Sequence, residues 1–103
     1  MQVFEKENSL SAINAEGKEI AELTFTYLDE SIIIVEHLYV GIHYRGQGIA
    51  KTLVNKIVEK AKQESKKIMP YCTFTRAEFR KSSAYQKVEF EQQISEAEIP
   101  QKV

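Results

Sequence analysis

The stretch that decides the fold, residues 40–54, reads Val40-Gly41-Ile42-His43-Tyr44-Arg45-Gly46-Gln47-Gly48-Ile49-Ala50-Lys51-Thr52-Leu53-Val54. It follows an apolar, β-branched run and opens directly into a helical pattern. A strand, a glycine loop and a helix in this order gather free backbone N–H groups at the positive end of a helix dipole, where a phosphate binds. Gly46 and Gly48 permit close approach of a ligand to the backbone, and Arg45 adds a permanent positive charge. The alternative is a tight turn whose glycines serve only the turn.

The composition sets limits on the class of protein. A chain of 103 residues, 43% hydrophobic and 28% charged, is typical of one soluble globular domain, here residues 1–103. The net charge of −1 disfavours a nucleic-acid binder that relies on bulk electrostatics. We find no apolar run long enough to span a membrane and no signal-peptide layout. The single cysteine cannot form an internal disulfide, so we expect a cytoplasmic protein.

The segments before the loop predict three strands. Residues 9–15 and 21–28 alternate apolar and polar side chains, the period of a half-buried strand. Residues 32–40 are apolar enough for the centre of a sheet. Because turn signals at residues 16–17 and 29–31 separate these segments, we expect an antiparallel meander.

The segments after the loop predict a helix, a short strand and a second, weaker helix. Apolar residues recur every four positions along one face of the first helix: Ile49, Leu53, Ile57 and Ala61. Residues 68–74 read as a strand in which Pro70 requires an edge or an irregular position. Residues 77–88 predict a short second helix, and the polar tail from Glu91 is expected to fray. The predicted fold class is α+β, an α/β layered arrangement with helices packed on a mixed sheet.

Three motifs resemble one known family. Arg45, Gly48 and Ala50 match the pattern Gln/Arg-x-x-Gly-x-Gly/Ala of the acetyl-CoA pyrophosphate loop in the GNAT N-acetyltransferase superfamily. The elements His37-Leu38-Tyr39-Val40 and Pro70-Tyr71-Cys72 resemble those of its compact subfamily, the minimal acetyltransferases, and the resemblance spans residues 9–90. It implies a GNAT-like mixed sheet with a pyrophosphate-binding loop and a central helix.

The resemblance also implies acetyl-CoA as co-substrate. Two histidines and one cysteine show no metal-ligand spacing, so we expect no metal. The implied pyrophosphate-binding residues are Arg45, Gly46, Gln47, Gly48, Ile49 and Ala50. The end of the preceding strand, Leu38, Tyr39 and Val40, is expected to bond the pantetheine arm. Arg76, Arg80 and Lys81 form a basic group that either meets the 3′-phosphate of CoA or is solvated surface.

Two residues are candidates for the acetyl-transfer chemistry itself. Cys72 is either a small buried hydrophobe or a nucleophile that accepts the acetyl group as a thioester. His37 is either a hydrogen-bonded strand histidine or the base, because neutral imidazole is basic near pH 7. Alternation along a strand points Glu36 away from His37, and we favour His37 as the residue facing the acceptor. His43, in the loop, is expected to be exposed structure.

Tyr85 is a third candidate. The run Ala84-Tyr85-Gln86-Lys87-Val88-Glu89-Phe90 resembles the family motif Tyr-x-Lys-Leu-Gly-Phe, whose tyrosine protonates the departing CoA thiolate. Glu89 stands where the family usually has glycine. The alternative is an amphipathic aromatic that packs its ring and leaves its hydroxyl wet.

We therefore predict an acetyl-CoA-dependent acetyltransferase acting on an unidentified amine or small nucleophile, either through a Cys72 thioester or by direct attack with His37 as base. The alternative is a non-catalytic CoA-binding module or sensor. This alternative is favoured by the short chain, which leaves few residues to build an acceptor pocket. A purely structural interaction domain would make the loop a coincidence. The expected partners are acetyl-CoA and the acceptor, with no nucleic acid and no membrane.

Overall fold

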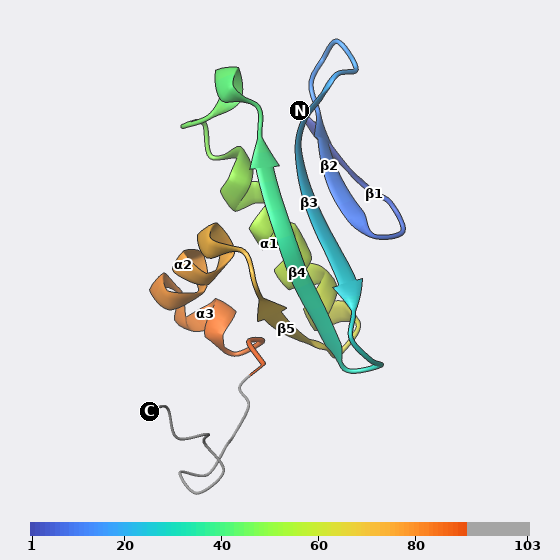
Figure 1. The fold of residues 1–103 in the computed structure, drawn as a ribbon, viewed down its shortest axis with the longest axis vertical. Helices are drawn as coiled ribbons and strands as arrows, with labels where there is room; N and C mark the ends of the chain where they lie inside the picture. The colour runs from blue at the N-terminus through green and yellow to red at the C-terminus, as the bar shows by residue number, and fades with distance from the viewer. Residues whose placement is uncertain (91–103) are drawn as a thin grey trace, which may run out of the picture.

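The computed structural model describes residues 1–90, which form a five-stranded mixed sheet with helices (Figure 1). The strands lie in chain order: β1 (Gln2–Glu5), β2 (Ser9–Ile13), β3 (Glu19–Tyr27), β4 (Ile32–Val40) and β5 (Lys67–Pro70). Pairs β1–β2, β2–β3 and β3–β4 are antiparallel, whereas β4 and β5 are parallel. The predicted α+β class, with its mixed sheet and antiparallel meander, is confirmed.

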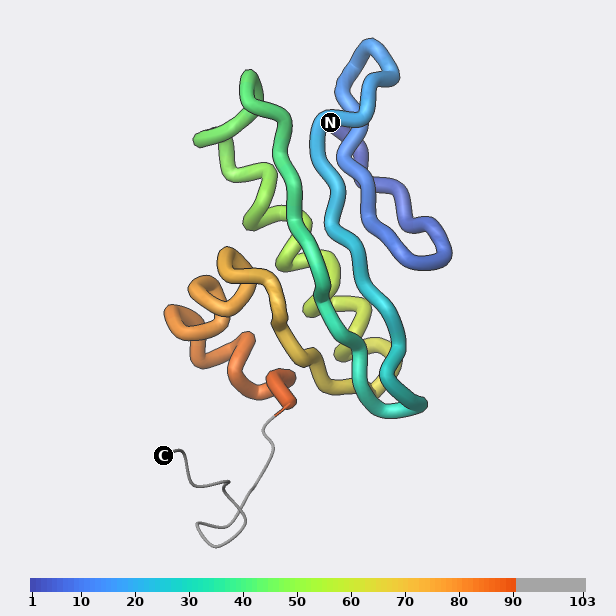
Figure 2. The backbone as a smooth tube through the Cα atoms, in the orientation of Figure 1, coloured from blue at the N-terminus to red at the C-terminus, as the bar shows by residue number. Residues whose placement is uncertain are grey.

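A 3-10 turn, η1 (Ile42–Tyr44), and helix α1 (Ile49–Gln63) follow β4, and the short helices α2 (Thr73–Lys81) and α3 (Ser83–Gln86) follow β5. The tube in Figure 2 shows that the β1–β2 hairpin and the pair α2–α3 lie at opposite edges of the sheet. No helix within residues 1–90 is long and apolar enough to cross a membrane.

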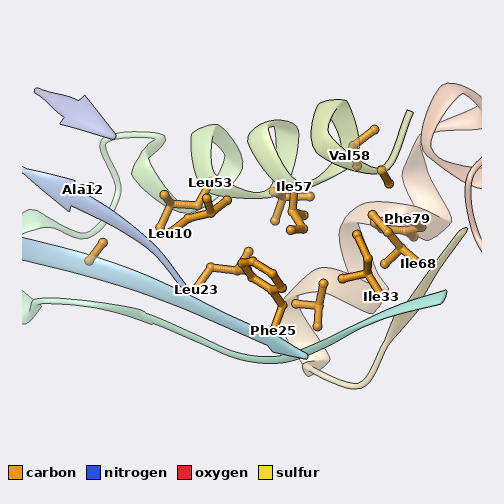
Figure 3. Close-up of a cluster of buried hydrophobic side chains, with 14 of the residues drawn as sticks. Leu10, Ala12, Leu23, Phe25, Ile33, Leu53, Ile57, Val58, Ile68 and Phe79 are labelled. Atoms are coloured by element: carbon orange, nitrogen blue, oxygen red, sulfur yellow. The ribbon is translucent and has the colours of Figure 1, made fainter. Parts of the chain in front are cut away.

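The core lies between α1 and one face of the sheet. Leu53 and Ile57 of α1 pack toward Leu23 and Phe25 of β3, and all four are fully buried (Figure 3). Full burial of one such side chain contributes roughly 1.5–3 kcal/mol, so this contact holds α1 to the sheet. Phe79 of α2 is also in the core, which fixes α2 against the β5 side.

Several bounds differ from the sequence prediction. β1 was not predicted because three of its four residues are exposed, so no alternation marks it. The predicted strand 68–74 ends at Pro70, and α2 begins at Thr73, which places Cys72 at the N-cap of α2 and not within a strand. Pro70 does lie on an edge strand, as predicted.

The predicted helix 77–88 is two helices separated at Ser82. The Ser82 Oγ accepts a hydrogen bond from the Tyr85 N–H at 3.1 Å, which caps α3 and breaks the continuous helix. The predicted fraying from Glu91 lies outside the described residues.

Candidate functional site

A pocket of about 580 Å³ opens at the carboxyl end of β4, beside the glycine loop. Four segments line it: the end of β4, the loop, the first turn of α1 and the first turn of α2. The lining residues are Leu38, Tyr39, Val40, Tyr44, Arg45, Gly46, Gly48, Ile49, Ala50, Lys51 and Phe74.

The pocket exists because β4 is longer than its parallel neighbour. The β4–β5 pairing ends at Val35 opposite Pro70, and the Tyr71 N–H then donates to the Val35 carbonyl at 2.9 Å. β4 continues to Val40, whereas the other chain segment turns into α2 (Figure 1). Phe74, in the first turn of α2, lines the pocket together with the end of β4.

The glycines of the loop adopt backbone conformations that other residues rarely adopt. Gly46 has φ +79° and Gly48 φ +82°, and a Cβ on either would meet no atom within 4 Å. Gly48 is the N-cap of α1 and supplies no side-chain cap, and the first turn holds no acidic residue. The N–H groups at the start of α1 thus have no capping side chain, and the positive end of the helix faces an open space.

Arg45 is exposed and fixes the end of β4. Its Nε donates to the Val40 carbonyl at 2.9 Å, which holds the guanidinium at the mouth of the pocket. On the other side of the loop, the Gly41 N–H donates to the Ile20 carbonyl at 2.8 Å. A Cβ on Gly41 would lie 3.2 Å from the Tyr44 ring, so glycine allows this tyrosine to pack against the strand end.

Most of the residues predicted to bind the co-substrate come together here. Eight of the nine line the pocket, and Gln47 is the exception. The sequence prediction omitted Tyr44, Lys51 and Phe74. Tyr44 and Lys51 directly flank the motif, so their position in the sequence could have identified them. Phe74 could not be identified in this way, because the sequence predicted a strand through residue 74.

β4, which carries His37, and β5, which precedes Cys72, are parallel neighbours. Each residue lies two positions beyond the last register pair, Val35 and Pro70. Cys72 is half-buried and packs partly against the core, whereas His37 is exposed and pairs in register with Thr24 of β3. Among residues 1–90, no hydrogen bond joins His37 to Cys72, and the catalytic role of each stays a prediction.

The regular alternation expected to separate Glu36 from His37 is absent, so that expectation is wrong. The β3–β4 register passes from Thr24 opposite His37 to Phe25 opposite Val35, so Glu36 is the extra residue of a β-bulge. A bulge interrupts the alternation of side chains, and both Glu36 and His37 are exposed.

Tyr85 of α3 lies against α1. Its hydroxyl is 3.4 Å from the Asn55 Oδ1, and its ring centroid is 5.5 Å from that of Phe79. Burial, together with the charges of Glu78 and Glu59, raises the pKa of the Tyr85 phenol above its ordinary value. Tyr85 is not among the residues lining the pocket, so its role as proton donor stays a prediction.

The predicted basic group does not line the pocket either. The Arg76 Nη2 donates to the Tyr71 carbonyl at 3.2 Å, and the Lys81 Nζ lies 3.5 Å from the Glu78 Oε2. His43 is exposed, as predicted. Within residues 1–90, no group of three or more His, Cys, Asp and Glu side chains is arranged to hold a metal ion.

Comparisons with known proteins agree with this geometry. A family model described as GCN5-related N-acetyl-transferase matches residues 11–88. The solution structure of a GCN5-like protein from Staphylococcus aureus is similar at TM-score 0.73 and 27% identity, covering 92% of this chain and 93% of that one.

Two larger proteins are similar over part of their length. A ribosomal-protein-alanine N-acetyltransferase from Brucella melitensis matches at TM-score 0.57 and 27% identity, over 84% of this chain and 63% of that one. A GNAT family N-acetyltransferase from Escherichia coli, crystallised in complex with CoA, matches at TM-score 0.55 and 25% identity, over 60% of this chain and 38% of its own. The chain thus spans less than two thirds of either larger protein. A search of curated proteins finds no significant match.

Proposed function

The chain belongs to the GCN5-related N-acetyltransferase family, and from this premise we propose that it binds acetyl-CoA in the pocket at the end of β4 and transfers the acetyl group to an amine or another small nucleophile. The predicted family and the predicted kind of enzyme, an acetyltransferase, are both confirmed by the match. The cytoplasmic location and the extent of the domain stay predictions.

One observation carries the proposal for binding: the uncapped start of α1, with Gly48 at φ +82°, faces a pocket that Arg45 also lines. Backbone N–H groups from Gly46 to Ala50 would hold the pyrophosphate, because they meet the positive end of the helix dipole there. The E. coli relative was crystallised with CoA, which supports the same ligand class here.

The pantetheine arm would lie along β4 from Leu38 to Val40, beyond the point where β5 stops pairing. Phe74, which also lines the pocket, would contact the arm from α2. The thioester would then lie near the fork, the point after Val35 and Pro70 where β4 and β5 part. Cys72 and His37 each lie two residues beyond that pair, and neither lines the pocket.

Two routes for the transfer remain proposals. In the direct route, the acceptor nitrogen attacks the thioester carbonyl, the C–S bond breaks, His37 takes the proton from nitrogen and the CoA thiolate leaves. In the relay, the Cys72 thiolate attacks the thioester carbonyl and CoA leaves as its thiolate. The acceptor nitrogen then attacks the Cys72 thioester, the C–S bond breaks, and the proton lost from nitrogen returns to the released Cys72 thiolate. Half-burial of Cys72 at the fork is compatible with the relay, and the exposure of His37 is compatible with the direct route.

The second candidate function is a CoA-binding module with little activity. The observation that favours it is the exposure of His37 on β4, together with a sheet face over which Figure 1 shows no helix of the described residues. Within residues 1–90, the pocket lining can thus enclose acetyl-CoA, whereas the region around His37 is open and would enclose an acceptor less well.

Calorimetric titration with acetyl-CoA tests binding, and absence of binding at millimolar ligand would reject both candidates. Intact-protein mass spectrometry after mixing with acetyl-CoA tests the relay. An acetyl adduct present in the wild type and lost in Cys72→Ser supports a Cys72 thioester. Turnover of an acceptor by Cys72→Ser at the wild-type rate would reject the relay and leave direct attack.

A further inference from the structure

Lys51 lies on the first turn of α1 and lines the pocket, although it is outside the matched motif. Its side chain is exposed. The ion pairs of the described residues 1–90 engage four other lysines, and Lys51 is not among them: Lys6, Lys60, Lys62 and Lys81. The Lys51 ammonium is thus a cation at the pocket without an acidic partner in this part of the chain.

The place of Lys51 on its helix is electrostatically unfavourable in the free protein. The first turn of a helix favours acidic side chains, because the backbone N–H groups there carry partial positive charge. α1 has no acidic residue in its first turn and no side-chain cap at Gly48. Arg45 adds a second cation to the same pocket. Two cations and a helix N-terminus together have no counter-charge within the pocket lining, and an anionic ligand would supply it.

Helix geometry directs Lys51 toward the loop. The Cα–Cβ bonds of an α-helix tilt toward its N-terminus, so a long side chain at Lys51 extends back toward Gly48. The neighbouring Thr52 is engaged differently: its Oγ1 donates to the Gly48 carbonyl at 3.1 Å. Lys51 therefore offers a charged donor on the first turn of α1.

The basic residues that the sequence suggested for a phosphate are elsewhere. Arg76 bonds to the Tyr71 carbonyl and Lys81 lies near Glu78, and neither they nor Arg80 line the pocket. A phosphate-binding cation besides Arg45 has to come from the lining, where Lys51 is the remaining lysine or arginine.

We propose that Lys51 binds a phosphate group of CoA together with the loop and Arg45. This inference rests on the proposed function, since it assumes CoA in the pocket. The shared chemistry is a phosphate, and two sources are available within the ligand: the pyrophosphate and the 3′-phosphate.

The test is calorimetric titration of CoA and of 3′-dephospho-CoA into wild type, Lys51→Gln, Lys51→Arg and Lys56→Gln, at low and high salt. Lys56 is the matched control, because it is an exposed lysine of the same helix that does not line this pocket. We expect Lys51→Gln to weaken CoA binding by about 10-fold at low salt, the lower end of the range for losing a hydrogen bond to a charged group, because the exposed ammonium is partly screened by water. Lys51→Arg should retain most of the wild-type affinity for CoA, and Lys56→Gln should bind CoA as tightly as the wild type does.

A loss confined to CoA assigns Lys51 to the 3′-phosphate, and a loss with both ligands assigns it to the pyrophosphate. The salt dependence of the dissociation constant should also fall in Lys51→Gln, which a merely structural role would not cause. Wild-type affinity in Lys51→Gln, or a loss with an unchanged salt dependence, would overturn the inference. Failure of the wild type to bind either ligand would instead reject the proposed function itself.

Discussion

The backbone N–H of Tyr71 donates to the carbonyl of Val35 at 2.9 Å, one residue beyond the last register pair of β4 and β5. From this bond the two chain segments part: β4 continues to Val40, and the other segment turns into α2 at Thr73. The pocket occupies the resulting fork, with the glycine loop on one side and Phe74 on the other. Cys72 follows Tyr71 directly, so the fork places the only cysteine between the sheet and the start of α2.

Gly48→Ala should weaken both folding and ligand binding. Gly48 has φ +82°, where an alanine Cβ is strained even though no atom lies within 4 Å. The strain should lower the free energy of unfolding by about 1–2 kcal/mol. Because relief of the strain moves the N–H groups at the start of α1, the dissociation constant for acetyl-CoA should rise as well. Denaturant unfolding and calorimetry measure the two effects separately.

Gly17→Ala is the matched control for this experiment. Gly17 has φ +79° in the β2–β3 turn, and a Cβ added there would likewise meet no atom within 4 Å. This variant should lose similar stability but bind acetyl-CoA as the wild type does. Equal loss of binding in both variants would mean that general destabilisation, and not the geometry of the loop, weakens the binding of acetyl-CoA.

Alanine substitutions of two phenylalanines of α2 should affect different properties, one the stability of the fold and the other the binding of acetyl-CoA. Phe79 is 1% exposed in the core, so Phe79→Ala should cost about 3–5 kcal/mol of unfolding free energy. Phe74 is 38% exposed and lines the pocket, so Phe74→Ala should cost at most about 1 kcal/mol yet weaken acetyl-CoA binding. Thermal unfolding and calorimetry on both variants test this. Unchanged affinity in a folded Phe74→Ala protein would remove α2 from the binding site.

Tyr85 should give the protein an alkaline pH dependence. Burial and the charges of Glu78 and Glu59 raise its pKa above the ordinary value of 10.0 in the folded state. The folded state therefore holds this proton more tightly than the unfolded state does. The corresponding stability is present in full below pH 10 and is lost as pH rises through the folded-state pKa.

The check is the free energy of unfolding measured against pH for wild type and Tyr85→Phe. Above pH 10, the wild type should lose stability more steeply than the variant, because phenylalanine cannot ionise. Parallel curves would contradict the raised pKa. The same variant, assayed for acetyl transfer, tests the predicted proton donor: an unchanged kcat would exclude that role.

Local patterns were sufficient to predict β4 and the start of α1, because apolar β-branched residues, two glycines and a helical repeat lie consecutively in residues 32–61. Eight lining residues of the pocket came from the same stretch. Phe74 was missed because the turn after Pro70 depends on where β5 meets β4, a contact between segments far apart in the chain.

The bulge at Glu36 was missed for a similar reason. It is visible only in the register of β4 against β3, where Thr24 opposes His37 and Phe25 opposes Val35. The position of the Tyr85 hydroxyl near Asn55 likewise depends on how α3 packs on α1. Neighbouring residues in the sequence carry no signal for either arrangement.

Binding of acetyl-CoA at the fork is tested most directly by titrating the ligand into labelled protein and following its amide ¹H–¹⁵N spectra. We predict the largest shifts at Gly46 to Lys51 and at Phe74. We predict little change at Glu5, Lys56 and Gln63, which line a separate cavity between α1 and the β1–β2 hairpin. Shifts concentrated at that second cavity, or no shifts at saturating ligand, would contradict binding at the fork.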